Sequence, residues 1–230
     1  LTSWGLLKDA WQTILIENPF PAICGRVCFH PCESACNRAN MDEPIAIHHL
    51  ERFLGDTALS EGREAHFNIK PANGKKVAIA GAGPAGLAAA YFLTRLGYGC
   101  EVFEARSEPG GLLRWGIPAY RLPPDILNRE ISRIKALGVT IHCETPVTED
   151  LLEKIRSEYN ALFIACGYER SITLKIQGGD LARDGLEFLR NLNPAAKTSL
   201  GGTAAIVGGG NTAVDIARSL IRRGVSPLIV

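Results

Sequence analysis

Two glycine-rich segments have the residue types and the spacing of a dinucleotide-binding turn. The first places glycines at positions 81, 83 and 86, and the second reads Gly-Gly-Gly-Asn-Thr-Ala over residues 208–213. Each segment follows an apolar, strand-like run and precedes an amphipathic helical pattern, which is the context that such a turn requires. Glycine lets the backbone turn tightly and approach a pyrophosphate, which the N–H groups at the helix N-terminus then bind. Two such turns in one chain predict two dinucleotides, one of which can reduce the other.

An acidic residue and a run of small residues support the first turn. Glu104 ends the next strand-like run, 23 residues after Gly81, where a carboxylate is expected to hydrogen-bond a ribose hydroxyl. The helical pattern after the turn carries Ala85, Ala88 and Ala89, which would let the helix pack closely on a sheet. The sequence therefore favours a dinucleotide site over glycines that serve packing alone.

The second turn follows the variant Gly-x-Gly-x-x-Ala, with Gly208, Gly210 and Ala213 in the three key positions. Asn211 is expected near the helix N-cap and Asp215 within the first helical turn. Counting 23 residues from Gly208 places the ribose-reading position just past Val230. An acid there would favour NAD and basic residues would favour NADP, so the sequence leaves this choice open.

Four of the seven cysteines, Cys24, Cys28, Cys32 and Cys36, are spaced four residues apart. Thiolates at this density are typical of zinc or iron–sulfur sites, and zinc sites made of four cysteines usually consist of two close pairs set well apart. Gly25 and Pro31 argue against one continuous helix, so we predict an irregular loop wrapped on a metal. Cys100, Cys143 and Cys166 lie in strand-like runs, which is typical of small buried side chains.

The composition excludes several classes of function. The formal net charge is +1, with 25 basic and 24 acidic side chains, so there is no basic field for nucleic acid. No apolar run approaches the ~20 residues of a membrane span, and the N-terminus lacks the architecture of a signal peptide. We therefore expect a cytoplasmic protein. The chain begins without Met and stops within an apparent strand, so we expect it to be a piece of a longer polypeptide.

The predicted elements alternate between strands and helices from residue 75 onward. Predicted helices cover 4–17, 45–59, 84–96, 125–137, 149–158, 186–192 and 212–223, and predicted strands cover 76–80, 100–104, 140–142, 161–165, 204–207 and 228–230. Such alternation indicates an α/β fold with a parallel sheet covered by helices on both faces. Residues 1–74 are predicted to form a small, helical, cysteine-rich domain with a linker, residues 75–200 a Rossmann-like domain, and residues 201–230 the start of a second Rossmann-like domain.

The first glycine turn and the residues that follow it resemble the FAD-binding domain of two-dinucleotide flavoproteins. The resemblance includes Glu104-Ala105-Arg106, Gly110-Gly111-Leu112-Leu113 and Gly116-Ile117-Pro118, then Arg121-Leu122-Pro123. It implies that Gly110 and Gly111 lie along FAD and that Arg121 shapes the isoalloxazine side of the site. Ala165-Cys166-Gly167 resembles the Ala-Thr-Gly turn near the flavin of that family. The second Rossmann-like domain is then the NAD(P)-binding domain, inserted into the FAD-binding domain.

The candidate cofactor-binding residues belong to the two turns and to the segments of this resemblance. They are Gly81, Ala82, Gly83, Pro84, Ala85, Gly86, Glu104, Ala105, Gly110, Gly111, Leu112, Leu113, Arg121, Ala165 and Gly167 for FAD, and Gly208, Gly209, Gly210, Asn211, Thr212 and Ala213 for NADP or NAD.

The cysteine segment resembles the N-terminal domain of the glutamate synthase small-subunit family, and the N-terminal region of dihydropyrimidine dehydrogenase is similar. The resemblance includes Asn18-Pro19-Phe20-Pro21 before the cysteines and Glu43-Pro44-Ile45-Ala46-Ile47 after them. It implies two 4Fe–4S clusters shared with a second, upstream cysteine group. Cys28 would bind one cluster and Cys32 and Cys36 the other, whereas Cys24 would not be a ligand. Glu51 aligns with a non-cysteine ligand or its neighbour.

The resulting hypothesis is an electron-transfer flavoprotein with NAD(P)H, FAD and 4Fe–4S centres. Electrons would pass to a partner subunit, which by resemblance could be the large subunit of glutamate synthase. No catalytic acid or base is required, and none of the five histidines has a partner pattern that would make it one. One alternative is a non-catalytic nucleotide-binding or scaffolding subunit with a zinc-stabilised N-terminus. A thioredoxin-reductase-like enzyme is disfavoured, because the chain contains no Cys-x-x-Cys pair.

Overall fold

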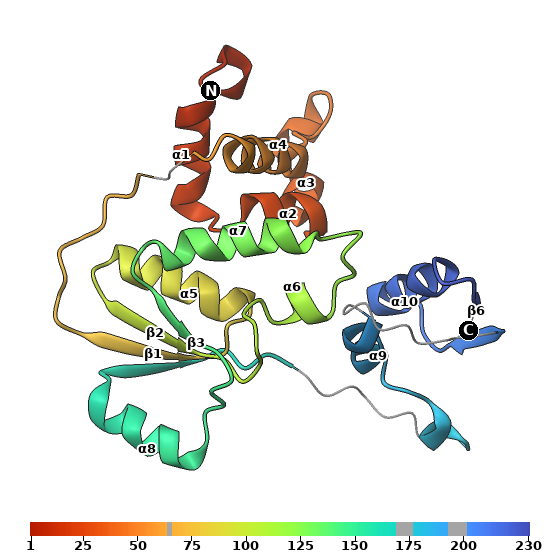
Figure 1. The fold of residues 1–230 in the computed structure, drawn as a ribbon. Helices are drawn as coiled ribbons and strands as arrows, with labels where there is room; N and C mark the ends of the chain where they lie inside the picture. Colours follow the sequence, from red (N-terminus) through yellow and green to blue (C-terminus); the bar gives the residue numbers. More distant parts are fainter. Residues whose placement is uncertain (64–65, 169–176, 193–201) are drawn as a thin grey trace.

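The computed structural model describes residues 1–63, 66–168, 177–192 and 202–230 of the chain (Figure 1). A group of short helices forms the N-terminal part. They are the 3-10 helix η1 (Thr2–Trp4), α1 (Leu7–Glu17), α2 (Pro21–Val27), α3 (Pro31–Ser34), the 3-10 helix η2 (Asn37–Asn40) and α4 (Ile47–Ser60). The predicted helices over 4–17 and 45–59 correspond to α1 and α4, with shifted starts.

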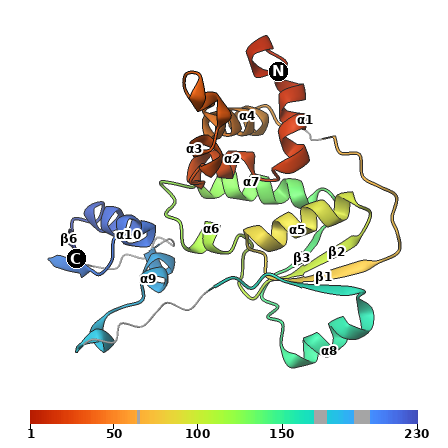
Figure 2. The same cartoon turned by 180° about the vertical axis from the view of Figure 1, so that it is seen from behind.

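A parallel sheet in the order β3-β2-β1-β4 follows. Its strands are β1 (Lys76–Ala80), β2 (Gly99–Phe103), β3 (Thr140–His142) and β4 (Ala161–Ile164), and its helices are α5 (Pro84–Arg95), α6 (Leu112–Trp115), α7 (Pro124–Lys135) and α8 (Glu149–Glu158). Helices α5 and α7 cover one face of the sheet and α8 lies on the other, as both views show (Figures 1 and 2). This arrangement is the one that the alternating pattern predicts.

A second, smaller unit contains the second glycine turn. Its elements are the 3-10 helix η3 (Gly179–Leu181), α9 (Gly185–Leu192), β5 (Thr203–Ile206), α10 (Asn211–Ile221) and β6 (Ser226–Ile229). Strands β5 and β6 pair in parallel, and the buried residues of α10 pack with Leu189 and Ile206. The predicted linker stretch 60–74 and the predicted domain 75–200 both include residues that lie outside the described ones.

The cysteine segment is more helical than predicted. Cys24 lies on α2 and Cys32 on α3, and the two helices are separated at Cys28–His30, where His30 adopts a left-handed φ of 50°. The prediction of an irregular loop was therefore wrong, although the segment is not one continuous helix. Pro21 and Pro31 each occupy the first position of a helix, where the missing N–H costs nothing.

Gly25 lies inside α2 because a neighbouring helix approaches it closely. A Cβ atom there would lie 2.5 Å from the Cβ atom of Arg52 on α4. The glycine that the sequence pattern presents as a helix breaker is therefore a contact point between two helices. The prediction that all three remaining cysteines are buried was also only partly right, because Cys100 is buried, Cys143 is half-buried and Cys166 is exposed.

The N-terminal helices and the first Rossmann-like unit share a hydrophobic core. Phe20 and Ile23, at the start of α2, belong to the same buried cluster as Val77, Leu127 and Ile131. Figure 1 shows α2 lying along α7. The cysteine-bearing helix is therefore packed directly on the unit that carries the first glycine turn.

Candidate functional site

The first glycine turn is a place of close backbone approach. Gly81 has a φ of +104°, and a Cβ atom there would lie 2.4 Å from the carbonyl oxygen of Ala165. At Gly86 a Cβ atom would lie 2.0 Å from the carbonyl oxygen of Gly81, and at Gly111 it would lie 2.7 Å from the Cα atom of Gly83. Gly110 donates its N–H to the carbonyl oxygen of Ala82 at 2.8 Å. The structure thus brings the predicted segments 81–86 and 110–111 together with Ala165 and Cys166, whereas a Cβ atom on Gly167 would meet nothing within 4 Å.

Gly83 differs from these glycines because its missing side chain leaves open space. The nearest atom to a Cβ atom there would be the Cα atom of Gly111, at 3.9 Å. Gly83 is the N-cap of α5, and Pro84 is the first helical residue. The first N–H groups of a helix have no partner within it, so they can bind an anion. A pyrophosphate therefore fits in front of α5, against the backbone of Gly83.

Glu104 lies beside this turn and is almost fully buried, at 7% exposure. Its Oε2 accepts the N–H of Ala82 at 2.7 Å, and its Oε1 accepts the N–H of Arg106 at 2.9 Å. The carboxylate therefore holds the glycine turn to the end of β2. Each carboxylate oxygen has a second lone pair, which leaves acceptor capacity for a ribose hydroxyl. Glu104 directly follows β2, its contact with a ribose stays a prediction, and its role in holding the turn was not predicted.

The second glycine turn is open at its mouth. Gly208 has a φ of +110°, and Cβ atoms built on Gly209 and Gly210 would meet nothing within 4 Å. Gly210 is the N-cap of α10 and Asn211 its first residue. Ala213 is buried against the core of this unit, which explains a small residue in the third key position. This geometry fits a second pyrophosphate.

Arg121 lies between the two units. Its Nη1 is 2.6 Å from Oδ2 of Asp215, whose side chain is 7% exposed. The neighbouring Tyr120 donates its hydroxyl to the carbonyl oxygen of Asp215 at 3.4 Å, and the Cζ atom of Arg222 lies 3.7 Å from the centre of its ring. Asp215 is the fifth residue of α10, so it lies just beyond the first helical turn, in which it was predicted. Arg121 thus contacts α10, and its position at the isoalloxazine side of the flavin stays a prediction.

This ion pair should couple the stabilities of the two units. We expect Arg121→Gln and Asp215→Asn to destabilise the protein individually, because each leaves a partly buried polar partner unpaired. The double variant should then lose less free energy of unfolding than the two single variants together, and the difference is a coupling energy of about 1–2 kcal/mol. Urea unfolding of the four proteins measures this energy, and additive effects would show that the pair contributes nothing.

The four clustered cysteines differ in their surroundings. Cys24 is half-buried, its Sγ lies 3.7 Å from Oδ1 of Asn18, and burial together with the nearby Glu51 raises its pKa to about 11. Cys28 and Cys32 are exposed. Backbone N–H groups, chiefly those of Ile45 and Arg38, lower the pKa of Cys36. Iron and zinc bind the thiolate, so the surroundings favour the last three cysteines as ligands.

The same segment contains a group that sequence reasoning missed. His48 donates its backbone N–H to Oε1 of Glu33 at 2.8 Å, and its Nδ1 lies 2.7 Å from the same oxygen. These contacts lower the pKa of Glu33. The ring of His30 stacks on that of His48 at 3.8 Å, and the donor atoms of His30, Glu33 and His48 all lie within 4.8 Å of one another. A zinc ion would require its ligand atoms to lie this close together. Among the described residues, no set of three cysteines does so.

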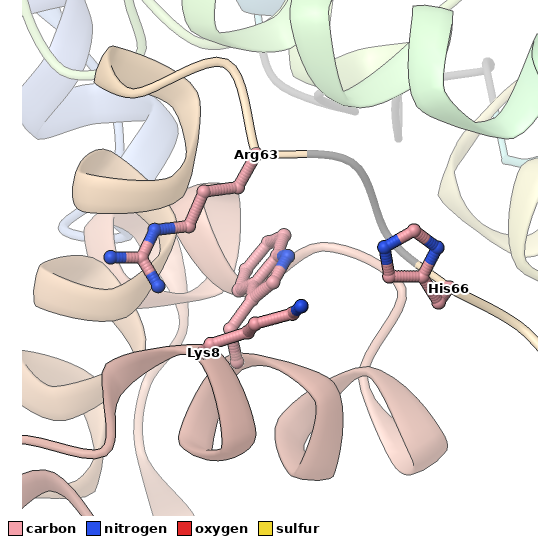
Figure 3. Close-up of a pocket in the computed structure, with 4 residues that line it drawn as sticks. Lys8, Arg63 and His66 are labelled. Atoms are coloured by element: carbon pink, nitrogen blue, oxygen red, sulfur yellow. The ribbon is translucent and has the colours of Figure 1, made fainter.

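A further pocket of about 470 Å³ lies on the N-terminal helices, away from both glycine turns. Lys8, Arg63 and His66 line it and are drawn in Figure 3, together with Trp11 on the same helix as Lys8. Arg63 is ion-paired with Glu61. The indole Nε1 of Trp11 is buried and without a partner among the described residues, so it is not accessible from this pocket. The pocket is basic and makes no contact with the candidate cofactor residues.

Two protein families match adjacent parts of the chain. Residues 2–63 match the dihydropyrimidine dehydrogenase domain II with its 4Fe–4S cluster, and residues 75–230 match the pyridine nucleotide-disulphide oxidoreductases. These matches confirm the predicted α/β fold class and the predicted cofactors: FAD, a nicotinamide nucleotide and a 4Fe–4S cluster. They also agree with the resemblance to FAD-dependent NAD(P)H oxidoreductases that carry an iron–sulfur domain. No described helix has the length and apolar character needed to cross a membrane.

The relatives found are subunits of several oxidoreductases. The chain is 46% identical to the NADP(+)-dependent formate dehydrogenase subunit beta of Moorella thermoacetica, covering 96% of this chain and 35% of that protein. It is 41% identical to the NADPH-Fe(3+) oxidoreductase subunit beta of Geobacter sulfurreducens, covering 94% of this chain and 34% of that protein. It is 39% identical to the NAD-dependent dihydropyrimidine dehydrogenase subunit PreT of Escherichia coli, covering 93% of this chain and 52% of that protein. The chain thus spans a third to a half of their lengths.

A solved structure shares the fold of the nucleotide-binding part. Mycobacterium tuberculosis FprA in complex with NADPH is 21% identical, with a TM-score of 0.57 over 70% of this chain and 43% of that one. At this identity the likeness extends to the fold alone.

Proposed function

Because the chain belongs to the pyridine nucleotide-disulphide oxidoreductase family, we propose that it takes electrons from NADPH or NADH and delivers them to a partner subunit through flavin and iron–sulfur centres. One observation carries this proposal: two open glycine turns, each in front of a helix N-terminus, lie on one chain with the exposed Cys28 and Cys32 and the half-buried Cys36. We call these turns cradles (residues 81–86 before α5, and 208–213 before α10), and the cysteine helix shares a core with the first cradle. When bound, the nicotinamide supplies a hydride, the flavin splits the electron pair, and the clusters pass single electrons.

The residues of the chain have separate tasks in this proposal. The backbone of Gly83 and the N-terminus of α5 bind the pyrophosphate of FAD, and Glu104 accepts a ribose hydroxyl while holding the turn. The segment Gly208–Ala213 binds the nicotinamide nucleotide in the same way. Cys28, Cys32 and Cys36 bind iron as thiolates, and Cys24 stays protonated. The Arg121–Asp215 pair orients α10 against the flavin-binding unit.

The proposed acceptor is a partner subunit, as in a multisubunit oxidoreductase. The names of the relatives connect similar chains with formate dehydrogenase, Fe(3+) reduction and dihydropyrimidine dehydrogenase. The large subunit of glutamate synthase, which the cysteine segment suggested, is a fourth candidate. Adding each purified candidate acceptor to the NADPH-reduced protein would distinguish them, because only the true acceptor should reoxidise it rapidly.

Gly210→Val tests the proposed nicotinamide site. A Cβ atom built on Gly210 meets no protein atom beyond its chain neighbours within 4 Å, so we expect the fold to tolerate valine and the bound pyrophosphate not to. We expect unchanged flavin content and an NADPH affinity about 100-fold weaker, equivalent to about 3 kcal/mol. The measurement is the NADPH dependence of flavin bleaching under anaerobic conditions, with Ser226→Val on the exposed start of β6 as a control. Wild-type NADPH affinity in Gly210→Val would refute the site.

A further inference from the structure

Glu130, on α7, is a buried acidic residue that neither cradle uses. Its side chain has no solvent exposure. Oε1 accepts the backbone N–H of Ala22, on α2, at 3.0 Å, and Oε2 is ion-paired with Arg133, one helical turn further along α7. The carboxylate thus connects the first Rossmann-like unit to the helix that bears Cys24.

Arg133 makes a second connection to the same segment. Its guanidinium donates to the carbonyl oxygen of Pro19 and lies 5.4 Å from the centre of the Trp11 ring. Helix α2 begins at Pro21. Arg133 thus contacts the backbone just before this start, at Pro19, and Glu130 contacts it just after, at Ala22. Helix α2 ends at Val27, directly before Cys28. The pair therefore fixes the start of the segment that presents the candidate cluster ligands.

Burying this ion pair is expensive, which suggests that it does more than stabilise the fold. Removing two charges from water costs several kcal/mol per ion, and apolar residues of similar volume often stabilise a protein as well or better. The contacts of Phe20 and Ile23 with the core are apolar, and the hydrophobic effect that drives them is non-directional. The hydrogen bonds of Glu130 and Arg133 to the backbone of Ala22 and Pro19 are directional, and they add a fixed orientation to this packing.

We infer that Glu130, with Arg133, is a positioning residue for electron transfer, which holds the cysteine segment at a fixed separation from the flavin cradle. The inference rests on the proposed function, because it concerns the step from flavin to cluster. Electron tunnelling slows exponentially with the distance between two centres, so a small shift of α2 changes its rate. Neither residue contacts a cradle, and hydride transfer to the flavin should not depend on them.

The double variant Glu130→Met/Arg133→Met separates positioning from stability. It replaces the ion pair with apolar side chains of similar size but leaves the Ala22 N–H and the Pro19 carbonyl oxygen without their side-chain partners, so we expect a melting temperature lower by several degrees and compare the proteins well below it, where both are folded. Rapid-mixing spectroscopy with NADPH should show unchanged flavin bleaching and at least tenfold slower cluster reduction. Hydrogen exchange of the amides in residues 19–28 should be at least tenfold faster, which requires no turnover.

Tyr91→Phe is the matched control. It removes another hydrogen bond from the Rossmann-like unit to the N-terminal helices, from the Tyr91 hydroxyl to the carbonyl oxygen of Leu15, but this bond anchors α1. Its cluster reduction should match the wild type. Wild-type cluster reduction and exchange in the double variant would overturn the inference. If NADPH fails to bleach the wild-type flavin, the proposed function fails instead, and the exchange comparison still tests the anchoring of α2.

Discussion

Gly83→Val is expected to abolish FAD binding while the protein still folds. The Cβ atom of a residue at this position would meet no protein atom closer than 3.9 Å, and its backbone φ of −75° is accessible to valine. The side chain would instead occupy the space where the pyrophosphate approaches the backbone. We expect an affinity for FAD at least about 100-fold weaker, equivalent to about 3 kcal/mol. Fluorescence titration of the flavin-free protein with FAD measures this effect.

The control for Gly83→Val is a glycine in ordinary contact with its surroundings. Gly99, on β2, has its nearest neighbour, the Cγ atom of Lys76, at 3.6 Å from a Cβ atom, so Gly99→Ala should retain wild-type FAD affinity. Gly86→Ala is not a suitable control, because its Cβ atom would overlap the carbonyl oxygen of Gly81 and disturb the fold. Normal flavin binding by Gly83→Val would show that FAD does not bind against the backbone of Gly83 at the N-terminus of α5.

Cys32→Ser is expected to lose cluster iron and to keep its flavin. Cys32 is exposed on α3, away from both glycine turns, and a serine hydroxyl is a poor substitute for a thiolate ligand of iron. Iron and acid-labile sulfide should fall sharply relative to the wild type, and the flavin should still be bleached by NADPH. Colorimetric iron and sulfide assays on the anaerobically purified variant measure this outcome.

Cys24→Ser is the matched control for this variant. Cys24 belongs to the same set of evenly spaced cysteines, but burial and the nearby Glu51 raise its pKa to about 11, so forming the thiolate that binds iron costs more here than at an ordinary cysteine. Cys24→Ser should therefore keep its iron. Loss of iron in Cys24→Ser with retention in Cys32→Ser would reverse the ligand assignment.

The sequence predicted the Rossmann-like elements well, because local patterns determine them. Strand β1 (Lys76–Ala80) and helix α8 (Glu149–Glu158) have the predicted bounds. In α8 the first turn contains two acidic residues, and the side chain of Thr148 caps it. The glycine turns were located because their residue types are required by the backbone itself, as the φ of +104° at Gly81 shows.

The cysteine segment was less predictable, because its conformation depends on contacts with distant residues. Gly25 and Pro31 were interpreted as helix breakers, yet Gly25 accommodates Arg52 on α4 and Pro31 starts a helix. The contact between Glu33 and His48 joins residues 15 positions apart and has no local sequence signal. Such pairs become visible only once the helices are packed.

The same limit applies to the charged residues that connect the units. Glu130 contacts Ala22, 108 positions earlier, and Arg121 contacts Asp215, 94 positions later. In the sequence, Glu130 belongs to an ordinary amphipathic helix rich in charged residues, and nothing local shows that its side chain is buried. The sequence thus predicts where the cofactors bind more readily than how their sites are held relative to one another.

Electron transfer from NADPH through flavin to an iron–sulfur cluster would be visible in the anaerobic absorption spectrum of the purified protein, recorded before and after NADPH is added. Flavin, iron and acid-labile sulfide are assayed on the same sample. We expect flavin bands over a broad iron–sulfur absorption, with both bleached by the nucleotide. Two results would contradict electron transfer from flavin to cluster. One is a colourless protein that contains zinc, and the other is a flavin that NADPH reduces while the iron–sulfur absorption keeps its intensity.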